Sequence, residues 1–386
     1  MERKYEIETL PYRITAAADP RPHAREAFTT EFGGEAYADV AELCERSPVD
    51  VVYIATPPEL HRAHAEIAAR CGKHMVVEKP LALTLEDCEA MIECADRHGV
   101  RMLAGHTHSF DAPIRKMREV VRSGEIGDLV MVNTWNYNEF NHRSRLPKEL
   151  ETTRGPILNQ GPHQVDVVRQ IGGGLVASVR ARVIEDSLSG CPGGYSCMLL
   201  FESGVPATLI YDGRSLFDTA ELFWWVSEGG LDRDPDLNWK RRRAYQEKAS
   251  LGRDGQAEAL DRAKEEGRYG AQGETAAGET TPPPYQPFFG LTVVSCDQGT
   301  MRQSRNGVTV YGDGGPREIP LGQELRGRAA ELAELYQGIV EDRPVFHDGR
   351  WAMATLEVCL AIVESSESGE EIALSRQVAV NDGPAA

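Results

Sequence analysis

Short apolar runs alternate with amphipathic segments over the first 105 residues of the chain. The run "VDVVYIATP" (49–57) is rich in β-branched residues and bounded by turn residues, which is typical of a strand buried on both faces. The next segment, "PELHRAHAEIAARCG", instead places its apolar residues at helical spacing. Such alternation predicts a parallel, doubly wound α/β sheet of the Rossmann type. The predicted strands are 13–19, 49–57, 73–80 and 100–106, and the predicted helices are 22–32, 58–72 and 84–99, the last with Thr84 as N-cap and Gly99 at its end.

The pattern changes after residue 110. One helix (112–124) leads into a longer alternating strand (129–140), and several further strands follow a second helix (162–171). We therefore expect an α/β domain over 1–110 and a C-terminal α+β domain with an open, mainly antiparallel sheet over 111–386. A polar, Gly/Pro-rich stretch at about 228–287 is expected to be a mobile insertion or lid, disordered in part. The other predicted strands are 176–185, 195–204, 205–213, 291–296 and 307–312, and two helices at about 324–341 and 349–366 close the chain.

Composition narrows the class of protein. The 386 residues are 41% hydrophobic and 26% charged, which suits a globular protein with a sizeable core. A formal net charge of -18 argues against nucleic acid or an anionic membrane as partner, so we expect a small molecule. No apolar run reaches the roughly 18 residues of a membrane span. The eight cysteines form no CxxC pair and the N-terminus does not resemble a secretory signal, so we expect a reducing cytoplasm.

Two motifs carry candidate chemistry. In "VVEKP", Lys79 and Pro80 follow the carboxyl end of a predicted parallel strand, where open α/β sheets bind ligands. In "NQGPHQVD", a helix begins with His163 and Asp166 on one face, and histidine is the natural general base near neutral pH. A solvated lysine and a structural histidine are the alternatives when each motif is taken alone.

The pair His106 and His108 follows the last strand of the first domain. These side chains could hydrogen-bond substrate oxygens. An H-x-H pair could also bind zinc, but the sequence offers no convincing third ligand, so we expect no metal.

Taken together, "EKP" and the Gly-x-His-x-x-Asp helix start about 80 residues later resemble the Gfo/Idh/MocA family of nicotinamide-dependent oxidoreductases. The resemblance implies an N-terminal Rossmann domain and a C-terminal open-faced sheet domain, which offers a surface for homo-oligomers. It implies His163 as the catalytic acid/base. The family usually has aspartate where this chain has Asn159, and a neutral amide cannot stabilise imidazolium as a carboxylate would. The resemblance implies that Thr56 and Pro57 border the cofactor and that His61 lies near it. The residues implied to flank the nicotinamide are Glu78, Lys79 and Pro80.

Four further segments resemble the phthalate dihydrodiol dehydrogenase branch of that family: "GHTHSFDAPI", "HRSRLPKELETTRG", "NQGPHQVDVVRQIGGG" and "FFGLTVVSCDQGTMRQS". This resemblance implies NAD-dependent oxidation of a carboxylated cis-dihydrodiol, in which His163 takes a proton and Lys79 stabilises the developing alkoxide. An anionic substrate needs cations, and arginine forks match carboxylates. A sugar or cyclitol substrate is the alternative. The basic loop before His163 contains His142, Arg143, Arg145, Lys148 and Arg154, of which we expect Arg143 and Arg145 to bind substrate beside His106, His108, Asn159 and Asp166.

One feature departs from the fold. In a dinucleotide-binding fold, the second strand ends at a carboxylate that binds ribose, and a glycine-rich loop precedes that strand. Asp19 in "YRITAAADPRP" has the position of this carboxylate, yet the eighteen residues before it contain no glycine. We therefore expect the first strand and its glycine-rich loop to be missing here, either because the true start lies upstream or because the chain is a non-catalytic paralogue that binds ligand or an oligomer partner. Asp19 favours NAD by repelling a 2′-phosphate, while Arg21 leaves NADP possible.

Overall fold

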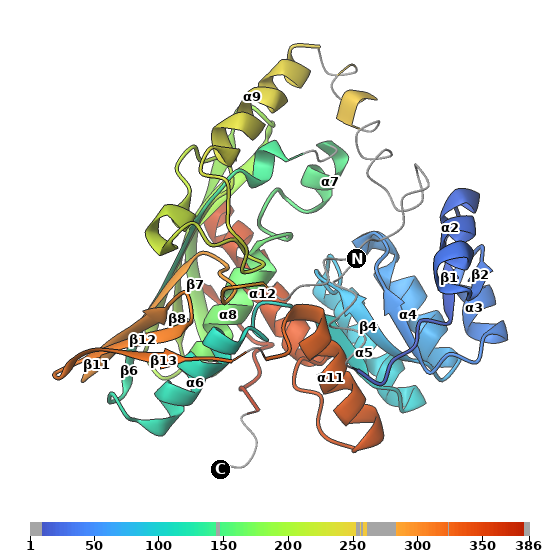
Figure 1. Ribbon diagram of the computed structural model, residues 1–386, viewed down its shortest axis with the longest axis horizontal. Coiled ribbons are helices and arrows are strands. Elements are labelled where there is room, and N and C mark those ends of the chain that lie inside the picture. The colour runs from blue at the N-terminus through green and yellow to red at the C-terminus, as the bar shows by residue number, and fades with distance from the viewer. Residues whose placement is uncertain are drawn as a thin grey trace. The chain divides into compact units, whose positions relative to one another are not determined.

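The computed structural model describes residues 10–143, 147–251, 255, 258–260, 283–322 and 324–381, without the side chains of residues 147 and 148. The chain divides into two compact units (Figure 1). The first junction between the units lies at 105/106, and residues 328–353 return to the first unit. Unit 1 contains the described residues of 1–105, 259–282 and 328–353, and unit 2 those of 106–258, 283–327 and 354–386.

Unit 1 alternates strands and helices as the sequence pattern predicted. Thr84 caps the helix after it, because its hydroxyl accepts a hydrogen bond from the Asp87 amide at 3.1 Å, and Gly99 ends that helix with φ 66°. The short strand β2 and helix α3 were not predicted. The elements of unit 1 are β1 (Ala16–Ala18), α2 (Pro22–Phe32), β2 (Glu35–Tyr37), α3 (Val40–Arg46), β3 (Val51–Ile54), α4 (His61–Arg70), β4 (His74–Glu78), α5 (Leu85–His98), β5 (Met102–Gly105), most of α11 (Gly327–Val340) and the first turn of α12 (Gly349–Ser368).

The strands of unit 1 form two separate parallel sheets. β1 pairs with β2, and β3, β4 and β5 pair in that order. In a doubly wound sheet the first strand lies between the strands that correspond here to β1 and β3. Among the described residues no strand pairs with both β1 and β3.

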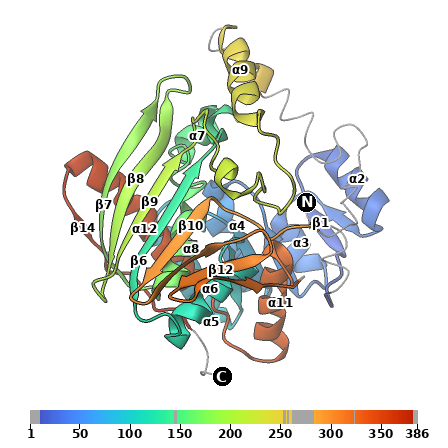
Figure 2. The same ribbon diagram turned by 60° about the vertical axis from the view of Figure 1, so that its left-hand side comes forward.

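Unit 2 is built on a nine-stranded sheet, which Figure 2 shows most openly. Its order is β13-β12-β11-β10-β6-β9-β8-β7-β14, and the pairing is antiparallel except between β6 and β9. The expected open, mainly antiparallel sheet is thus confirmed. Its strands are β6 (Leu129–Tyr137), β7 (Val176–Asp186), β8 (Cys191–Phe201), β9 (Pro206–Asp212), β10 (Leu291–Cys296), β11 (Gly299–Gln303), β12 (Gly307–Gly312), β13 (Gly315–Pro320) and β14 (Ile372–Ala373).

Helices α6 (Ala112–Ser123), α8 (Gly161–Gly172) and α12 lie along one face of this sheet (Figure 2). Helix α8 is buried on every side from Gly161 to Ile171. Gln164 joins it to the sheet, donating to the Ile210 carbonyl at 3.1 Å and accepting from the Tyr195 hydroxyl at 2.7 Å. The start of α8 is therefore fixed relative to the strands beneath it.

The stretch at about 228–287, which was expected to be a mobile insertion or lid with disorder in part, contains a helix in its described part. Helix α9 (Leu237–Ala249) begins inside it, and buried Asn238 donates to the carbonyls of Ser215 and Phe217 at 3.2 and 3.0 Å. Residues 261–282, on which the rest of the expectation falls, lie outside the described residues.

None of the helices in the described part of the chain is both long enough and apolar enough to cross a membrane.

Candidate functional site

Asp19 directly follows β1, at the carboxyl end of the strand. Arg21 donates hydrogen bonds to the Asp19 carboxylate from Nε at 2.9 Å and from Nη2 at 2.7 Å. The backbone amide of Arg21 donates to the same carboxylate at 2.8 Å. Burial raises the pKa of Asp19, but the hydrogen bonds and charge of Arg21 outweigh it and the net pKa is lowered. The carboxylate, 29% exposed, is therefore ionised and oriented at the carboxyl end of a parallel strand.

Glu78 and Lys79 lie at the carboxyl end of β4, as expected for residues beside a ligand. Arg328 of α11 forms an ion pair with Glu78 and contacts Tyr53, whose hydroxyl donates to Glu78 at 3.1 Å. Burial nevertheless raises the pKa of Glu78. The peptide bond between Lys79 and Pro80 is cis.

His61, which was predicted to lie near the cofactor, begins helix α4. Its ring is buried and binds the backbone of two loops, with Nε2 at 2.8 Å from the Thr56 carbonyl and Nδ1 at 3.1 Å from the Pro80 carbonyl. It therefore ties the turn after β3 to the turn after β4. Thr56 in turn lies 3.1 Å from His64 Nδ1, and Pro57 is exposed beside it. These contacts make His61 a scaffold for the predicted cofactor edge.

In unit 2, His163 stands at the start of α8 within an aromatic cluster. The rings of His163 and His108 meet edge to face with centroids 4.9 Å apart, and Phe289 lies 4.5 Å from His108 and 5.3 Å from His163. His108 Nδ1 is 3.0 Å from the carboxylate of Asp111. The structure thus brings together two residues that the sequence selected, His163 and His108, and adds Asp111 and Phe289.

The other polar residues around this helix start differ in character. Asn159 accepts a hydrogen bond from the Gln160 side chain at 2.8 Å. Asp166 is fully buried and its charge acts on Arg169, one turn along α8. His106 is also fully buried, and Ser109 donates to its carbonyl at 3.1 Å. Asp166 and His106 are therefore enclosed within unit 2. Direct contact of either side chain with a ligand stays a prediction.

The described basic residues of the loop before His163 lie close to carboxylates. Arg143 binds Glu139 through Nε at 3.1 Å and lies 3.8 Å from Glu228. Glu139 is completely buried, and its pKa is lowered because the charges of Arg143, Arg233 and Arg241 outweigh the effect of burial. Arg154 faces Glu367 at 3.7 Å, and His142 is buried 3.8 Å from Asp186. Arg145 lies outside the described residues.

Sequence reasoning missed Arg233 and Arg241. Arg233 lies 2.5 Å from both Glu139 and Asp218, and Arg241 of α9 lies 2.8 Å from Glu139. They come from the stretch expected to be mobile, about a hundred residues after Glu139. The basic run "KRRR" at 240–243 was the sequence signal that could have pointed to Arg241.

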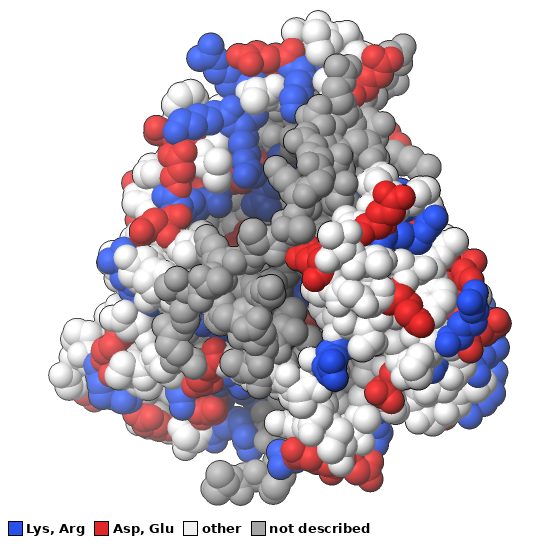
Figure 3. All heavy atoms as spheres, turned by 45° about the vertical axis from the view of Figure 1, so that its right-hand side comes forward, with Lys and Arg blue, Asp and Glu red and all other residues white. Residues whose placement is uncertain are grey.

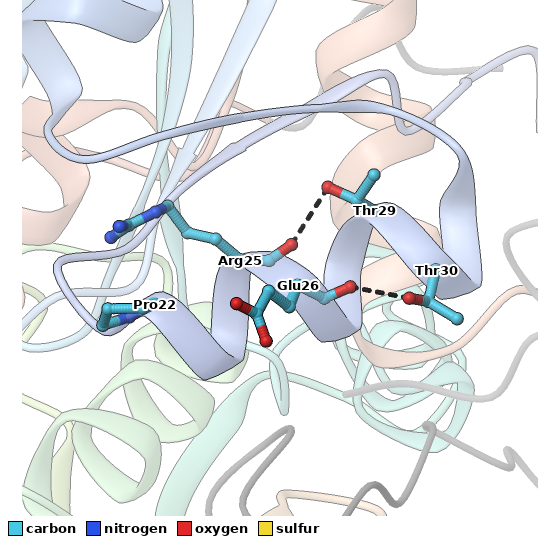
Figure 4. A pocket seen from close by; sticks show the side chains of 5 residues that line it. All are labelled: Pro22, Arg25, Glu26, Thr29 and Thr30. Atoms are coloured by element: carbon cyan, nitrogen blue, oxygen red, sulfur yellow. Dashed lines mark hydrogen bonds between the residues drawn. The ribbon is translucent and has the colours of Figure 1, made fainter.

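A surface hollow elsewhere on unit 1 carries no comparable chemistry. It is lined by one face of α2, and the hydroxyls of Thr29 and Thr30 are taken up by the helix carbonyls of Arg25 and Glu26 (Figure 4). On the face shown in Figure 3, acidic and basic side chains are interspersed.

Comparisons with known proteins agree with this architecture. Residues 3–106 match a family model described as GFO_IDH_MocA, an oxidoreductase family with an NAD-binding Rossmann fold, and residues 114–222 match the GFO/IDH/MocA C-terminal domain. The chain is 34% identical over 371 residues to the 1-carboxy-3-chloro-3,4-dihydroxycyclo hexa-1,5-diene dehydrogenase of Comamonas testosteroni, covering 92% of this chain and 89% of that one.

Two solved structures are similar over the same length. A Bordetella bronchiseptica RB50 structure has a TM-score of 0.84 at 34% identity, covering 94% of this chain and 93% of that one. The WlbA dehydrogenase of Bordetella pertussis, solved with NADH and UDP-GlcNAcA, has a TM-score of 0.67 at 17% identity, covering 96% and 93%. The second likeness supports the fold alone.

The position of Asp19 generates a prediction about cofactor choice. Replacing Asp19 by serine removes the carboxylate that repels a 2′-phosphate and releases Arg21 to bind one. We expect the ratio of kcat/KM for NAD to that for NADP to fall by tenfold or more, about 1.4 kcal/mol, in steady-state assays with each cofactor. Asp50→Ser is the matched control, because Asp50 lies directly before β3, at the end of a parallel strand that is opposite to the cofactor end. This variant should leave the ratio unchanged. An unchanged ratio in Asp19→Ser would contradict the assignment.

Proposed function

The chain belongs to the Gfo/Idh/MocA family of oxidoreductases, and we propose that it oxidises a carboxylated cyclic cis-dihydrodiol to the corresponding catechol. As a member of this family it is an NAD(P)-dependent oxidoreductase. The observation that carries the substrate proposal is the 34% identity, over 92% of the chain, to a dehydrogenase named for a carboxylated dihydroxycyclohexadiene. Loss of hydrogen from such a ring yields an aromatic product, which favours oxidation.

The residues of unit 1 fit a dinucleotide. An ionised carboxylate directly after β1 suits ribose hydroxyls, and dinucleotides bind at the carboxyl ends of parallel strands such as β3 and β4. We assign the ribose to Asp19, the adjoining edge to Thr56 and Pro57, and the nicotinamide to Glu78, Lys79 and Pro80. When bound, the nicotinamide supplies the hydride acceptor.

The residues of this chain handle the proton and the oxygen. We assign to His163, which is mostly buried, the role of the base that accepts the carbinol proton. Lys79 provides a cation for the oxygen as it becomes an alkoxide. Asn159 adds a neutral amide at the start of the same helix.

We assign the substrate carboxylates to the arginines around Glu139. One buried carboxylate receives guanidinium groups from Arg143, Arg233 and Arg241, so their positions are set before any ligand arrives. The side chain of Arg241, 39% exposed, is the most accessible of the three. Burial lowers the pKa of Arg241, and the neighbouring guanidinium charges lower it further. A substrate carboxylate would act against both effects by stabilising the charged form of Arg241.

We further propose that the enzyme is a cytoplasmic homo-oligomer that associates through the outer face of the unit 2 sheet. That face exposes large apolar side chains on β6 and β8: Trp135, Met198 and Leu200. Sedimentation velocity of the full chain and of Met198→Lys would test this. We expect the variant to shift toward monomer, whereas an unchanged distribution would rule out this face.

Catalysis is tested with alanine variants of Lys79 and His163. Each should lower kcat for a phthalate dihydrodiol at least a hundredfold, followed by NADH absorbance, because each removes a group acting on the reacting O–H. Lys116→Ala and His98→Ala remove the same kinds of side chain from helix surfaces and should retain activity. Near-wild-type rates in both active-site variants would refute the assignment.

Substrate class is tested with the same assay on the wild-type protein. We expect carboxylated cyclic diols to be oxidised and neutral polyols such as inositols to be poor substrates, because a polyol offers the arginines around Glu139 no carboxylate to bind. Arg241→Leu should raise KM for the carboxylated diol about tenfold, with Arg243→Leu, an exposed neighbour on α9, as control. Turnover of polyols with none of carboxylated diols would replace this proposal with the cyclitol alternative.

A further inference from the structure

The loop before α6 fixes an imidazole against the proposed base. Asp111 ends this loop, and its amide donates to the His108 carbonyl at 3.2 Å while its own carbonyl receives the amides of Ile114 and Arg115 at 2.9 and 3.1 Å. The loop is therefore braced by its own hydrogen bonds and by the helix that follows. The carboxylate of Asp111 is directed to His108 Nδ1 at 3.0 Å.

The ring of His108 is restrained on three sides. Phe289 stacks on it with centroids 4.5 Å apart and planes 28° apart, Asp111 lies at Nδ1, and His163 meets it at 75° with centroids 4.9 Å apart. A proton on Nδ1, shared with the carboxylate, places the lone pair of the neutral ring on Nε2. His108 is thus oriented as carboxylate-bound histidines are in proton-transfer sites.

Burial of the Asp111 carboxylate favours a proton on the pair that it forms with His108. Asp111 is fully buried, and burial raises its pKa more than the hydrogen bond and charge of His108 and the charges of Arg326 and Arg115 lower it. On α8 the facing groups are His163 itself and Asp166, whose charge acts on Arg169. An imidazolium at His108 would offset the cost of the buried carboxylate.

We propose that His108, held by Asp111, is a positioning residue that shares with His163 the proton taken from the substrate. This rests on the proposed function, in which His163 is the base. Because the two rings are in contact and only one lies against a carboxylate, they take up protons as a coupled pair. Asp111 supplies the counter-charge that the neutral Asn159 cannot.

The proton balance is complete. The substrate O–H bond breaks as an N–H bond forms on His163, the hydride goes to the oxidised nicotinamide, and the proton then passes from His163 to Nε2 of His108. Asp111 faces the resulting imidazolium. Release of that proton to water restores both neutral rings.

The direct test measures titration without substrate or cofactor. Ring ¹³C and ¹⁵N resonances of His163 and His108 are followed against pH in the full chain, and assigned with His163→Gln and His108→Gln. In Asp111→Asn the first proton taken up by the pair should bind about one pH unit lower, because a nearby anion is lost. Glu119→Gln, at an exposed site on α6, should leave the titration unchanged. An unchanged or raised midpoint in Asp111→Asn would overturn the proposal.

A second variant keeps the test decisive if Asp111→Asn does not fold. In the wild type the resonances of His163 should shift in two steps, and in His108→Gln in one step. Identical curves for His163 in the two proteins would overturn the proposal.

Turnover provides the functional readout. For Asp111→Asn we expect kcat for the carboxylated diol to fall roughly tenfold, less than for loss of the base itself, with KM unchanged and the acidic limb of the pH profile moved to lower pH. A profile that matches the wild type would overturn the proposal. If the wild-type protein oxidises no such diol, the proposed function fails, while the NMR titration still decides whether Asp111 and His108 govern the protonation of His163.

Discussion

The burial of helix α8 on all sides is the constraint on which the candidate site depends. A helix without an exposed face cannot leave polar side chains to water, so each must find a partner inside the protein. Gln164 therefore bonds the sheet backbone and the Tyr195 hydroxyl, and these contacts hold the first turn of α8 in one position. The position of His163 is therefore fixed as well, because it lies in this first turn. The rings of His108 and Phe289 pack against its imidazole.

In both units, carboxylates that are buried or partly buried hold the arginines beside them in position. Arg21 is fixed by Asp19, Arg328 by Glu78, and three arginines by Glu139. A site that must receive anionic ligands in a protein of net charge -18 needs its cations ordered locally, because the overall field is repulsive. The ion pairs of Asp19, Glu78 and Glu139 with arginines provide such locally ordered cations and do not require a basic surface.

The local elements could be predicted because local signals determine them. The helix at 22–32 has the predicted bounds, and Thr84 and Gly99 cap their helix as expected. Contacts between distant segments had no such signal. The sequence selected His108 and His163 separately, but their contact, and the stacking of Phe289 on both, depends on the sheet that brings α6, α8 and β10 together. The scaffold role of His61 likewise arises from two turns that meet only in the folded unit.

The central claim is that this chain moves a hydride from the carbinol carbon of a carboxylated cis-dihydrodiol to a nicotinamide. A phthalate dihydrodiol carrying deuterium at its carbinol carbons tests it directly, with the reduced cofactor analysed by mass spectrometry after turnover by the full-length protein. The account predicts that the recovered NADH is one mass unit heavier and that deuterium lies at C4 of the nicotinamide. Unlabelled NADH, or no NADH while the diol is recovered unchanged, would contradict it.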